Sequence, residues 1–376
     1  MTGISNLGQA IDRIDRLKTQ QNILDTLSTQ IATGKKTQQF SGLDGDVLRS
    51  QRARADLNQL DQYTTNIKNA SRRIDLMTTS LEQIKAQANN LLNGLTIAPQ
   101  GGDYPDFETT QELAVDVYDY IIDLMNMRDG DRYLFAGSDS SVKPIDDDGL
   151  FSTFLGTYVP DPDDRLVNPP LEQSGFIGDW GAGLITTDEF INAYQNVNDT
   201  ILGYSTSLVS GTTGDVRVRV DENSDFEYTV LANTEGLREV LLAIGVVKDM
   251  VPPEFAPGAA DTPNPLDPTV EPPPTPDAEQ QANFYAVIND LAATIAEATD
   301  KIDREIYRLS LTEAQVQTIE ESYIYQSDAL KTIVADVEDV DLNETVAKIQ
   351  QAQVSLEASY SVTALISDLT LVNFLR

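Results

Sequence analysis

Residues 60–95, LDQYTTNIKNASRRIDLMTTSLEQIKAQANNLLNGL, repeat apolar side chains at alternating spacings of three and four. This heptad pattern is typical of a helix that packs along one face against another helix, with polar residues between the apolar ones. It continues without a break over five heptads. The positions are Leu60, Tyr63, Ile67, Ala70, Ile74, Met77, Leu81, Ile84, Ala88, Leu91 and Leu95.

A second heptad repeat lies near the C-terminal end of the chain. Its apolar residues are seven apart and run through Ile288, Ile295, Ile302, Leu309, Val316, Tyr323, Leu330 and Val337. At a rise of 1.5 Å per residue, the two helices would be about 58 and 85 Å long. These lengths exceed those of ordinary core helices and favour an elongated helical packing over the alternative of two separate amphipathic helices. We expect the two helices to lie antiparallel, so that each covers the apolar stripe of the other.

Weaker stripes of the same kind occur at both ends of the chain. Gly34 and residues 38–46 break the N-terminal helix into two. The C-terminal stripe becomes almost wholly apolar, and we expect it to bury itself against a partner subunit, with an intrachain helix contact as the alternative. The predicted subunit-interface residues are Ile4, Leu7, Ile11, Ile14, Leu24, Leu27, Ile31, Leu356, Tyr360, Leu365, Leu369, Val372 and Phe374.

The middle of the chain has a different character. We predict a helix over 108–128, a strand over 133–136, β-type segments at 152–159 and 215–231, and a helix over 234–250. The segment 215–231 alternates apolar and polar residues about a turn at Asn223 and Ser224, which predicts a hairpin. Residues 252–277 hold 10 of the 17 prolines, which is typical of a semi-rigid linker.

The sequence therefore predicts an α+β, mainly α fold, in which long antiparallel terminal helices form a coiled-coil rod with an inserted β-rich domain. Terminal helices are expected at 1–42 and 342–376, and a helical rod domain at 43–138 and 279–341. A β-rich outer domain is expected at 139–251, followed by the proline-rich linker at 252–278. The predicted core of the rod comprises Leu60, Ile67, Ile74, Leu81, Ile288, Ile295, Ile302, Leu309 and Val316.

Composition excludes several classes of function. The 376 residues include no Cys and no His, so thiol and imidazole nucleophiles, zinc sites of those ligands and disulfides are excluded. The net charge of −34 argues against nucleic-acid and anionic-membrane partners. Residues 101–279 contain 8 Lys and Arg against 35 Asp and Glu, so the negative charge is concentrated there. No apolar run is long enough to span a bilayer, and the first residues lack the pattern of a Sec signal.

Without Cys and His, only oxygen-ligand sites for Ca²⁺ or Mg²⁺ remain, and the acidic clusters of the sequence suggest calcium. Asp146, Asp147 and Asp148, and separately Asp161, Asp163 and Asp164, are the best candidates. Neither has the alternate ligand spacing and closing Glu of an EF-hand loop, so we interpret them as solvated loops and predict no metal and no cofactor. No carboxylate pair stands out as catalytic, and we predict that the chain is not an enzyme.

Three segments resemble the bacterial flagellin and flagellin-like hook-associated protein family. These are IATGKKTQQF (31–40) with the heptad helix after it, DGDRYLFAGSDSSVKPI (129–145), and the tail 337–376. Within the family, YLFAG (133–137) favours the hook–filament junction protein over a filament flagellin, which remains the alternative. An acidic, calcium-dependent surface-binding module on a helical stalk is a further alternative from the residues themselves.

The resemblance implies a structural subunit rather than an enzyme. It implies that the terminal helices form the inner tube of a helical assembly and that the insert faces solvent. It also implies extracellular placement after export through the flagellar type III channel without a cleaved signal peptide. The implied partners are further copies of the chain in a helical lattice, a neighbouring hook-associated protein, flagellin and a flagellar export chaperone.

Overall fold

The computed structural model describes residues 2–96, 107–146, 148–156, 175–181, 185–250 and 278–374. The chain divides into two compact units, one made of Met1–Gln62 with Glu321–Arg376 and the other of Tyr63–Glu320. We call them the terminal unit and the central unit. The two longest helices, α2 (Val47–Thr96) and α9 (Ala278–Glu338), contribute residues to both units.

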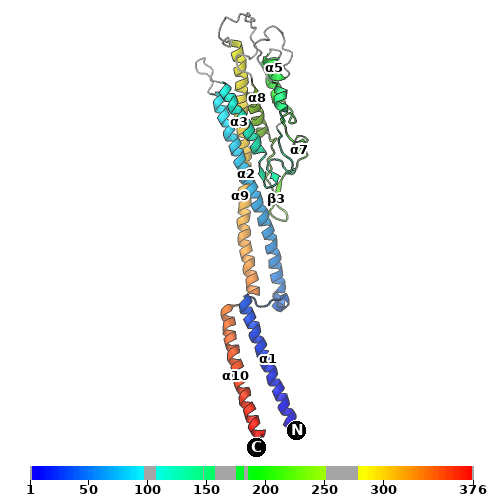
Figure 1. Cartoon of the computed structure of the whole chain (residues 1–376), viewed down its shortest axis with the longest axis vertical. Helices are drawn as coiled ribbons and strands as arrows, with labels where there is room; N and C mark the ends of the chain where they lie inside the picture. The colour runs from blue at the N-terminus through cyan, green and yellow to red at the C-terminus, as the bar shows by residue number, and fades with distance from the viewer. Residues whose placement is uncertain are drawn as a thin grey trace. The chain divides into compact units, whose positions relative to one another are not determined.

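The terminal unit is entirely helical in its regular structure. Helix α1 (Thr2–Thr33) is followed by the short 3-10 helix η1 (Phe40–Asp46) and the start of α2, and the end of α9 is followed by α10 (Leu342–Phe374). Helices α1 and α10 lie side by side with both chain ends at the same end of the pair (Figure 1). The predicted break of the N-terminal helix at Gly34 is confirmed, because α1 ends at Thr33 and Gly34 has a φ of 69°.

In the central unit, α2 and α9 run antiparallel. Lys85 pairs with Asp303 at 2.6 Å and Lys68 with Glu320 at 3.8 Å. The step from Lys68 forward to Lys85 along α2 is as long as the step from Glu320 back to Asp303 along α9. Equal steps in opposite directions mean that the two helices keep one register between these contacts.

The apolar stripes of α2 and α9 are buried in this unit. Ile67, Ile74 and Leu81 have 0% exposure, and in the terminal unit Leu60 is half-buried. On α9 the buried stripe comprises Ile288, Ile295, Ile302, Leu309 and Val316. The heptad spacing therefore places these side chains on the inner faces of their helices.

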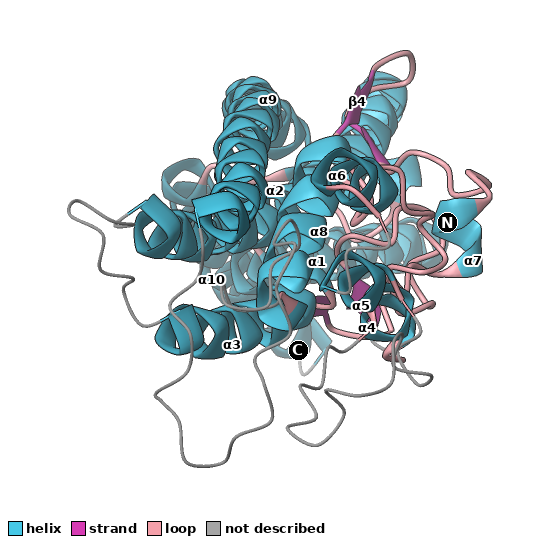
Figure 2. Cartoon of the chain, turned by 90° about the horizontal axis from the view of Figure 1, so that it is seen from above, coloured by secondary structure: helices cyan, strands magenta, loops and turns pink. Residues whose placement is uncertain are grey.

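Two further helices complete the core of the central unit. Helix α8 (Glu235–Asp249) is apolar on nearly all sides, as expected of a helix surrounded by protein, and it packs on α3 (Phe107–Met125). Seen end-on, α8 lies amid α2, α3, α6 (Thr187–Gln195) and α9 (Figure 2). A Cβ at Gly245 would lie 2.5 Å from the ring of Phe151, so only glycine fits at this helix contact.

The described part of residues 139–251 is mainly helices and loops rather than β-rich. Its strands are β3 (Arg217–Arg219) and β4 (Asp225–Glu227), which form the predicted hairpin with Val218 opposite Phe226. The other small sheet lies earlier, where β1 (Arg128–Asp129) pairs with β2 (Arg132–Tyr133). The remaining helices are α4 (Leu150–Leu155), α5 (Phe176–Gly181) and α7 (Thr206–Val209).

Two of the strand predictions are wrong, and one structural reason is clear. Of the predicted segment 152–159, residues 152–155 belong to helix α4, in which Phe151 and Leu155, four residues apart, are both buried on one helical face. Residues 157–159 lie outside the described residues. Residues 134–136, predicted as strand, follow the two-residue strand β2 as bends, with their side chains in the core. The helices predicted at 108–128 and 234–250 are confirmed, except that α3 ends at Met125 and Arg128 belongs to strand β1. The mainly α class is confirmed as well. The linker predicted at 252–278 lies outside the described residues, save for the first residue of α9 at its end.

No helix in the described ranges is both long and apolar enough to cross a membrane.

Candidate functional site: the terminal helix pair and its junction

The terminal unit contains a junction at which the chain passes from α1 to α2 and from α9 to α10. Beyond α1, the backbone of residues 34–36 runs antiparallel to that of residues 338–340. The Lys36 amide donates to the carbonyl of Glu338 at 2.7 Å, and the Val340 amide donates to the carbonyl of Gly34 at 3.0 Å. Two segments from opposite ends of the sequence are thus held together by main-chain hydrogen bonds.

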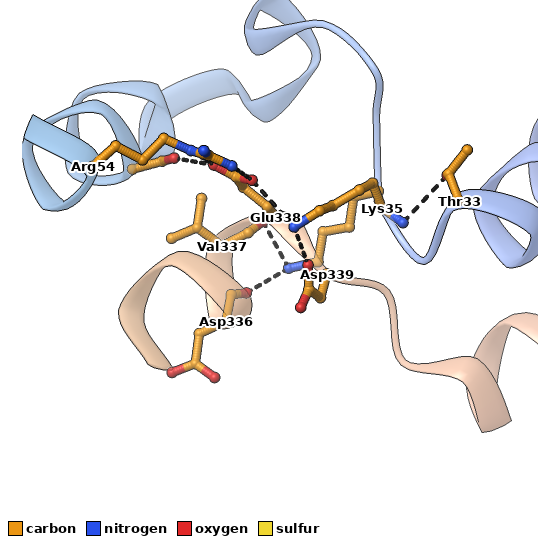
Figure 3. A network of polar contacts seen from close by, with 9 residues as sticks. Thr33, Lys35, Arg54, Asp336, Val337, Glu338 and Asp339 are labelled. Atoms are coloured by element: carbon orange, nitrogen blue, oxygen red, sulfur yellow. Dashed lines mark hydrogen bonds and ion pairs between the residues drawn. The ribbon is translucent and has the colours of Figure 1, made fainter. Parts of the chain in front are cut away.

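Glu338 is the centre of the polar cluster at this junction (Figure 3). Its carboxylate accepts hydrogen bonds from Arg54 Nε at 2.7 Å and Arg54 Nη2 at 2.5 Å, and also from the Ser50 hydroxyl. Lys35 Nζ lies 3.3 Å from the same carboxylate and 2.5 Å from Asp339. We call Lys35, Ser50, Arg54, Glu338 and Asp339 the junction cluster.

The cluster holds Glu338 in its charged form. Only 8% of its side chain is exposed, yet its pKa falls to about 2, first because of the Arg54 hydrogen bonds and then because of Ser50 and Lys35. The same contacts raise the pKa of Lys35, chiefly through Asp339, and that of Arg54 through Glu338. A carboxylate so well supplied with donors is a structural anchor, because its charge is already satisfied by protein groups.

Both helix ends at the junction are capped by nearby side chains. Lys36 Nζ donates to the carbonyls of Asp336 at 2.6 Å and Val337 at 3.1 Å, which are among the last of α9. The Asp341 carboxylate accepts from the amides of Asn343 at 2.9 Å and Glu344 at 3.2 Å in the first turn of α10. The caps fix where α9 ends and α10 begins.

Polar side chains connect α1 to α10 along their length. Gln20 Nε2 donates to Ser355 Oγ at 2.7 Å, and Ser359 Oγ donates to Gln20 Oε1 at 3.2 Å. Gln21 Nε2 donates to the hydroxyl of Tyr360 at 2.7 Å. The pair is therefore held in part by polar contacts, which leaves apolar side chains of both helices free to face outward.

The predicted interface residues are divided between the contact of the pair and its outer surface. Leu27 is buried, and Leu24, Ile31 and Leu356 are half-buried. The exposed ones are Ile11 (51%), Ile14 (52%), Tyr360 (47%) and Leu365 (63%). The side chains of Ile4, Leu7, Leu369, Val372 and Phe374 lie outside the part of the structure that is described.

Further apolar residues of these helices are exposed, although they were not among the predicted interface residues. They are Ile23, Val354 and Val362, of which Val354 is 66% exposed. The sequence could have indicated these residues, because apolar residues occur on several faces of α10 rather than on one. A helix that is apolar on several sides and packed on only one of them leaves the rest for another molecule.

The described residues offer no group of three or more acidic side chains placed to hold a metal ion. Of the candidate calcium ligands, Asp146 pairs with Lys143 at 2.9 Å, and Asp148 accepts from the amide of Leu150 at 3.0 Å, at the start of α4. The other four candidates, Asp147, Asp161, Asp163 and Asp164, are not among the described residues. The described pair thus has structural partners of its own.

Comparison with known proteins shows a distant structural likeness and no sequence match. No protein-family model and no curated protein matches the chain. Among solved structures, the chain is similar to one described as a flagellar hook-associated protein from Vibrio parahaemolyticus, with 10% identity and a TM-score of 0.46. The match covers 78% of this chain and 97% of the other. A likeness of this strength carries no argument about function.

Proposed function

We propose that the chain is a structural subunit of the bacterial flagellum that joins the hook to the filament. The observation that supports this most is the terminal helix pair, which leaves large apolar side chains of both α1 and α10 exposed. Ile11 and Ile14 on α1, and Val354 and Leu365 on α10, are each at least half exposed. Exposed apolar side chains are unfavourable in water, and assembly with other subunits would bury them.

Burial of these side chains between subunits would drive assembly. Complete burial of one Leu, Ile or Val side chain is worth about 1.5–3 kcal/mol, so several of them outweigh the entropy of association. The contacts must be heterologous, because subunits of a helical lattice repeat along the lattice instead of closing a two-fold pair. In this proposal the α1–α10 pair is a coiled coil that forms the inner tube.

The remaining parts of the proposal come from the family resemblance. The subunit is exported through the flagellar type III channel without a cleaved signal peptide. A flagellar export chaperone is one of its partners. Its neighbours are further copies of itself, another hook-associated protein and flagellin. The role is structural rather than enzymatic, and the negative charge of residues 101–279 keeps an apolar-ended subunit soluble before assembly.

A filament flagellin would present the same kind of terminal helix pair, so it is the second candidate. The YLFAG segment at 133–137 favours the junction protein. Its Tyr133, Leu134, Phe135 and Ala136 are all buried, so the segment belongs to the core of the central unit. The two candidates differ in abundance, because a junction protein occupies one short zone and its loss releases filament protein into the medium.

Truncation tests the assembly role. We expect that deletion of residues 1–30 or of residues 345–376 abolishes incorporation into the flagellum and leaves the central unit folded. The single tryptophan, Trp180, is fully buried in the central unit, so its fluorescence reports whether that unit is intact. Incorporation of either truncated chain at the hook tip would refute the proposal.

A further inference from the structure

The central unit has a basic pocket in an otherwise acidic molecule. The pocket has a volume of about 500 Å³ and lies between α2 and the β3–β4 hairpin. Four arginines line it together with two amide side chains, and these are Arg73, Arg132, Arg217, Arg219, Asn66 and Asn69. Only 8 Lys and Arg occur in residues 101–279, and three of the four arginines come from this small set. This concentration makes the pocket a candidate anion site.

The arginines are only partly neutralised within the chain. Arg73 is 8% exposed, and its Nη2 donates to the carbonyl of Tyr133 at 3.2 Å, but its Nε is buried without a hydrogen-bond partner. Arg219 donates to the main-chain carbonyls of Asp221 and Glu222 rather than to a carboxylate. Arg132 has no carboxylate partner within the described ranges of the chain. A buried guanidinium with an unused donor is costly, and an incoming carboxylate would satisfy it.

Several carboxylates lie near the pocket and offset part of the positive charge of its arginines. Asp215 is part of the lining, and Arg217 lies 3.5 Å from it and 3.6 Å from Glu227. Asp129 lies 4.0 Å from Arg73 but pairs more closely with Arg72, at 3.0 Å. All these contacts are at or beyond 3 Å, and the pocket retains more guanidinium charge than its carboxylates can balance.

A matching acidic surface lies on α3. Five carboxylates follow one another at spacings of three and four, which places them on one helical face. All five are exposed, and in the part of the chain that is described none has an ion-pair partner; they are Glu108, Glu112, Asp116, Asp119 and Asp123. We call this face the α3 acidic stripe.

The β3–β4 hairpin, whose residues line the pocket, and α3, which carries the acidic stripe, lie on opposite sides of α8. In the end-on view, the hairpin is at the upper right and α3 at the lower left, with α8 between them (Figure 2). Two complementary surfaces on opposite sides of one body cannot meet within one molecule. They can meet between neighbours, in a contact that repeats from subunit to subunit.

We propose that the arginine pocket of one subunit binds the α3 acidic stripe of a second copy of this chain. The inference rests on the proposed function, since it supplies a lateral contact between the outer parts of assembled subunits. Carboxylates of the stripe pair with the guanidinium groups at the pocket, and charge complementarity sets the register of neighbouring copies.

Charge reversal in cells that express the full chain tests this contact. The first variant carries Arg217→Glu and Arg219→Glu, and the second carries Glu112→Lys and Asp116→Lys; all four residues are exposed. We expect each variant to reduce incorporated subunit at least tenfold, with the unassembled protein recovered from the medium. The chain that carries all four changes restores the attraction and is expected to assemble within about threefold of the unaltered chain. As a control, Asp300→Lys changes an exposed carboxylate that belongs to neither surface and leaves incorporation unchanged.

The outcomes separate this inference from the proposed function. If the unaltered chain does not assemble, the proposed function is wrong. If the unaltered chain assembles and the single-surface variants assemble equally well, the pocket is not an interface and the inference is wrong. Loss in both variants without recovery in the combined chain would also overturn it, because the partner of the pocket would then be something other than α3. Trp180 fluorescence identifies any misfolded variant. A misfolded arginine variant is replaced by Arg217→Gln with Arg219→Gln, which is judged by its loss of incorporation alone, because neutral side chains cannot restore the attraction in a combined chain.

Discussion

At the level of single residues, Glu338 links both ends of the sequence within the terminal unit through its contacts with Ser50, Arg54 and Lys35. Its pKa is lowered to about 2 from 4.5, so the folded unit is stabilised by its charge at pH values above the unfolded pKa. This stabilisation is lost as the pH falls from about 5 toward 2, when the folded carboxylate takes up its proton. Glu338 is therefore expected to make the unit acid-sensitive.

Replacement of Glu338 by Gln tests this dependence. At pH 7 we expect Glu338→Gln to reduce the free energy of unfolding of the terminal unit by about 1–2 kcal/mol, a modest value because Arg54 and Lys35 are partly solvated. The difference from the unaltered chain should shrink between pH 5 and pH 2. Circular dichroism measures total helix loss on heating, and Trp180 fluorescence identifies the part that belongs to the central unit.

Glu313 provides a control of opposite sign. Burial, and then the neighbouring carboxylate of Asp75, raise its pKa above the usual 4.5. An acid with a raised folded pKa costs stability as the pH rises, so Glu313→Gln is expected to be neutral or stabilising at pH 7. Equal losses in Glu338→Gln and Glu313→Gln would mean that the junction cluster has no special role.

Gly34 is the second residue on which the junction depends. Its φ of 69° is in the left-handed region, and a Cβ there would meet no atom within 4 Å. Gly34→Ala is therefore expected to destabilise the terminal unit by about 1–2 kcal/mol through backbone conformation alone. Gly45, which is equally free of neighbours and has no positive φ, is the matched control, and Gly45→Ala should be close to neutral. Urea denaturation followed by circular dichroism compares the two, and equal effects would rule out a conformational requirement at Gly34.

At the scale of elements, the buried stripe of α9 determines the stability of the central unit. Ile302 is 1% exposed, whereas Leu311 on the same helix is 49% exposed. We expect Ile302→Ala to cost about 2–4 kcal/mol, because it removes buried methyl groups and leaves a cavity, and Leu311→Ala to cost less than about 0.5 kcal/mol. Urea denaturation followed by Trp180 fluorescence measures both, and similar midpoints would contradict the assignment of the inner face.

The long helices could be predicted from sequence because their signal is local and repeats many times. The heptad from Leu60 to Leu95 needs no knowledge of the rest of the chain, and neither does the stop at Gly34. The segment 152–159 could not be predicted in this way. Its run of apolar and β-type residues fits a strand or a short helix equally well. The contact of Phe151 with Gly245 of α8 is compatible with the helix, and it is made only in the folded chain.

The candidate site was predictable only in part, for the same reason. The apolar stripes identified Ile11, Ile14 and Leu365 as interface residues. They did not show that polar contacts, such as that of Gln20 with Ser355, would hold α1 against α10 and leave these apolar residues exposed. The junction cluster was missed because it joins Lys35 and Arg54, near one end of the sequence, to Glu338, near the other. The spacing of residues along the sequence cannot predict a contact between segments that come together only in the folded chain.

At the scale of the whole molecule, the distribution of charge and apolar surface fits a building block. Exposed apolar residues are found on α1 and α10, the net negative charge is concentrated in residues 101–279, and the central unit has a basic pocket. Such a subunit would associate by its ends through burial and by its outer surface through charge. Raised salt should weaken the second kind of contact much more than the first.

The location of the protein on the cell distinguishes a hook–filament junction protein from a filament flagellin. The measurement is fluorescent labelling of the full chain, through a cysteine introduced at the exposed Asp300, on living cells with intact flagella. Since the chain has no cysteine of its own, the label reports that position alone. We expect one labelled zone at the base of each filament, where hook and filament meet. Label along whole filaments would assign the chain to the filament itself, and label over the cell body without any on flagella would refute a flagellar role.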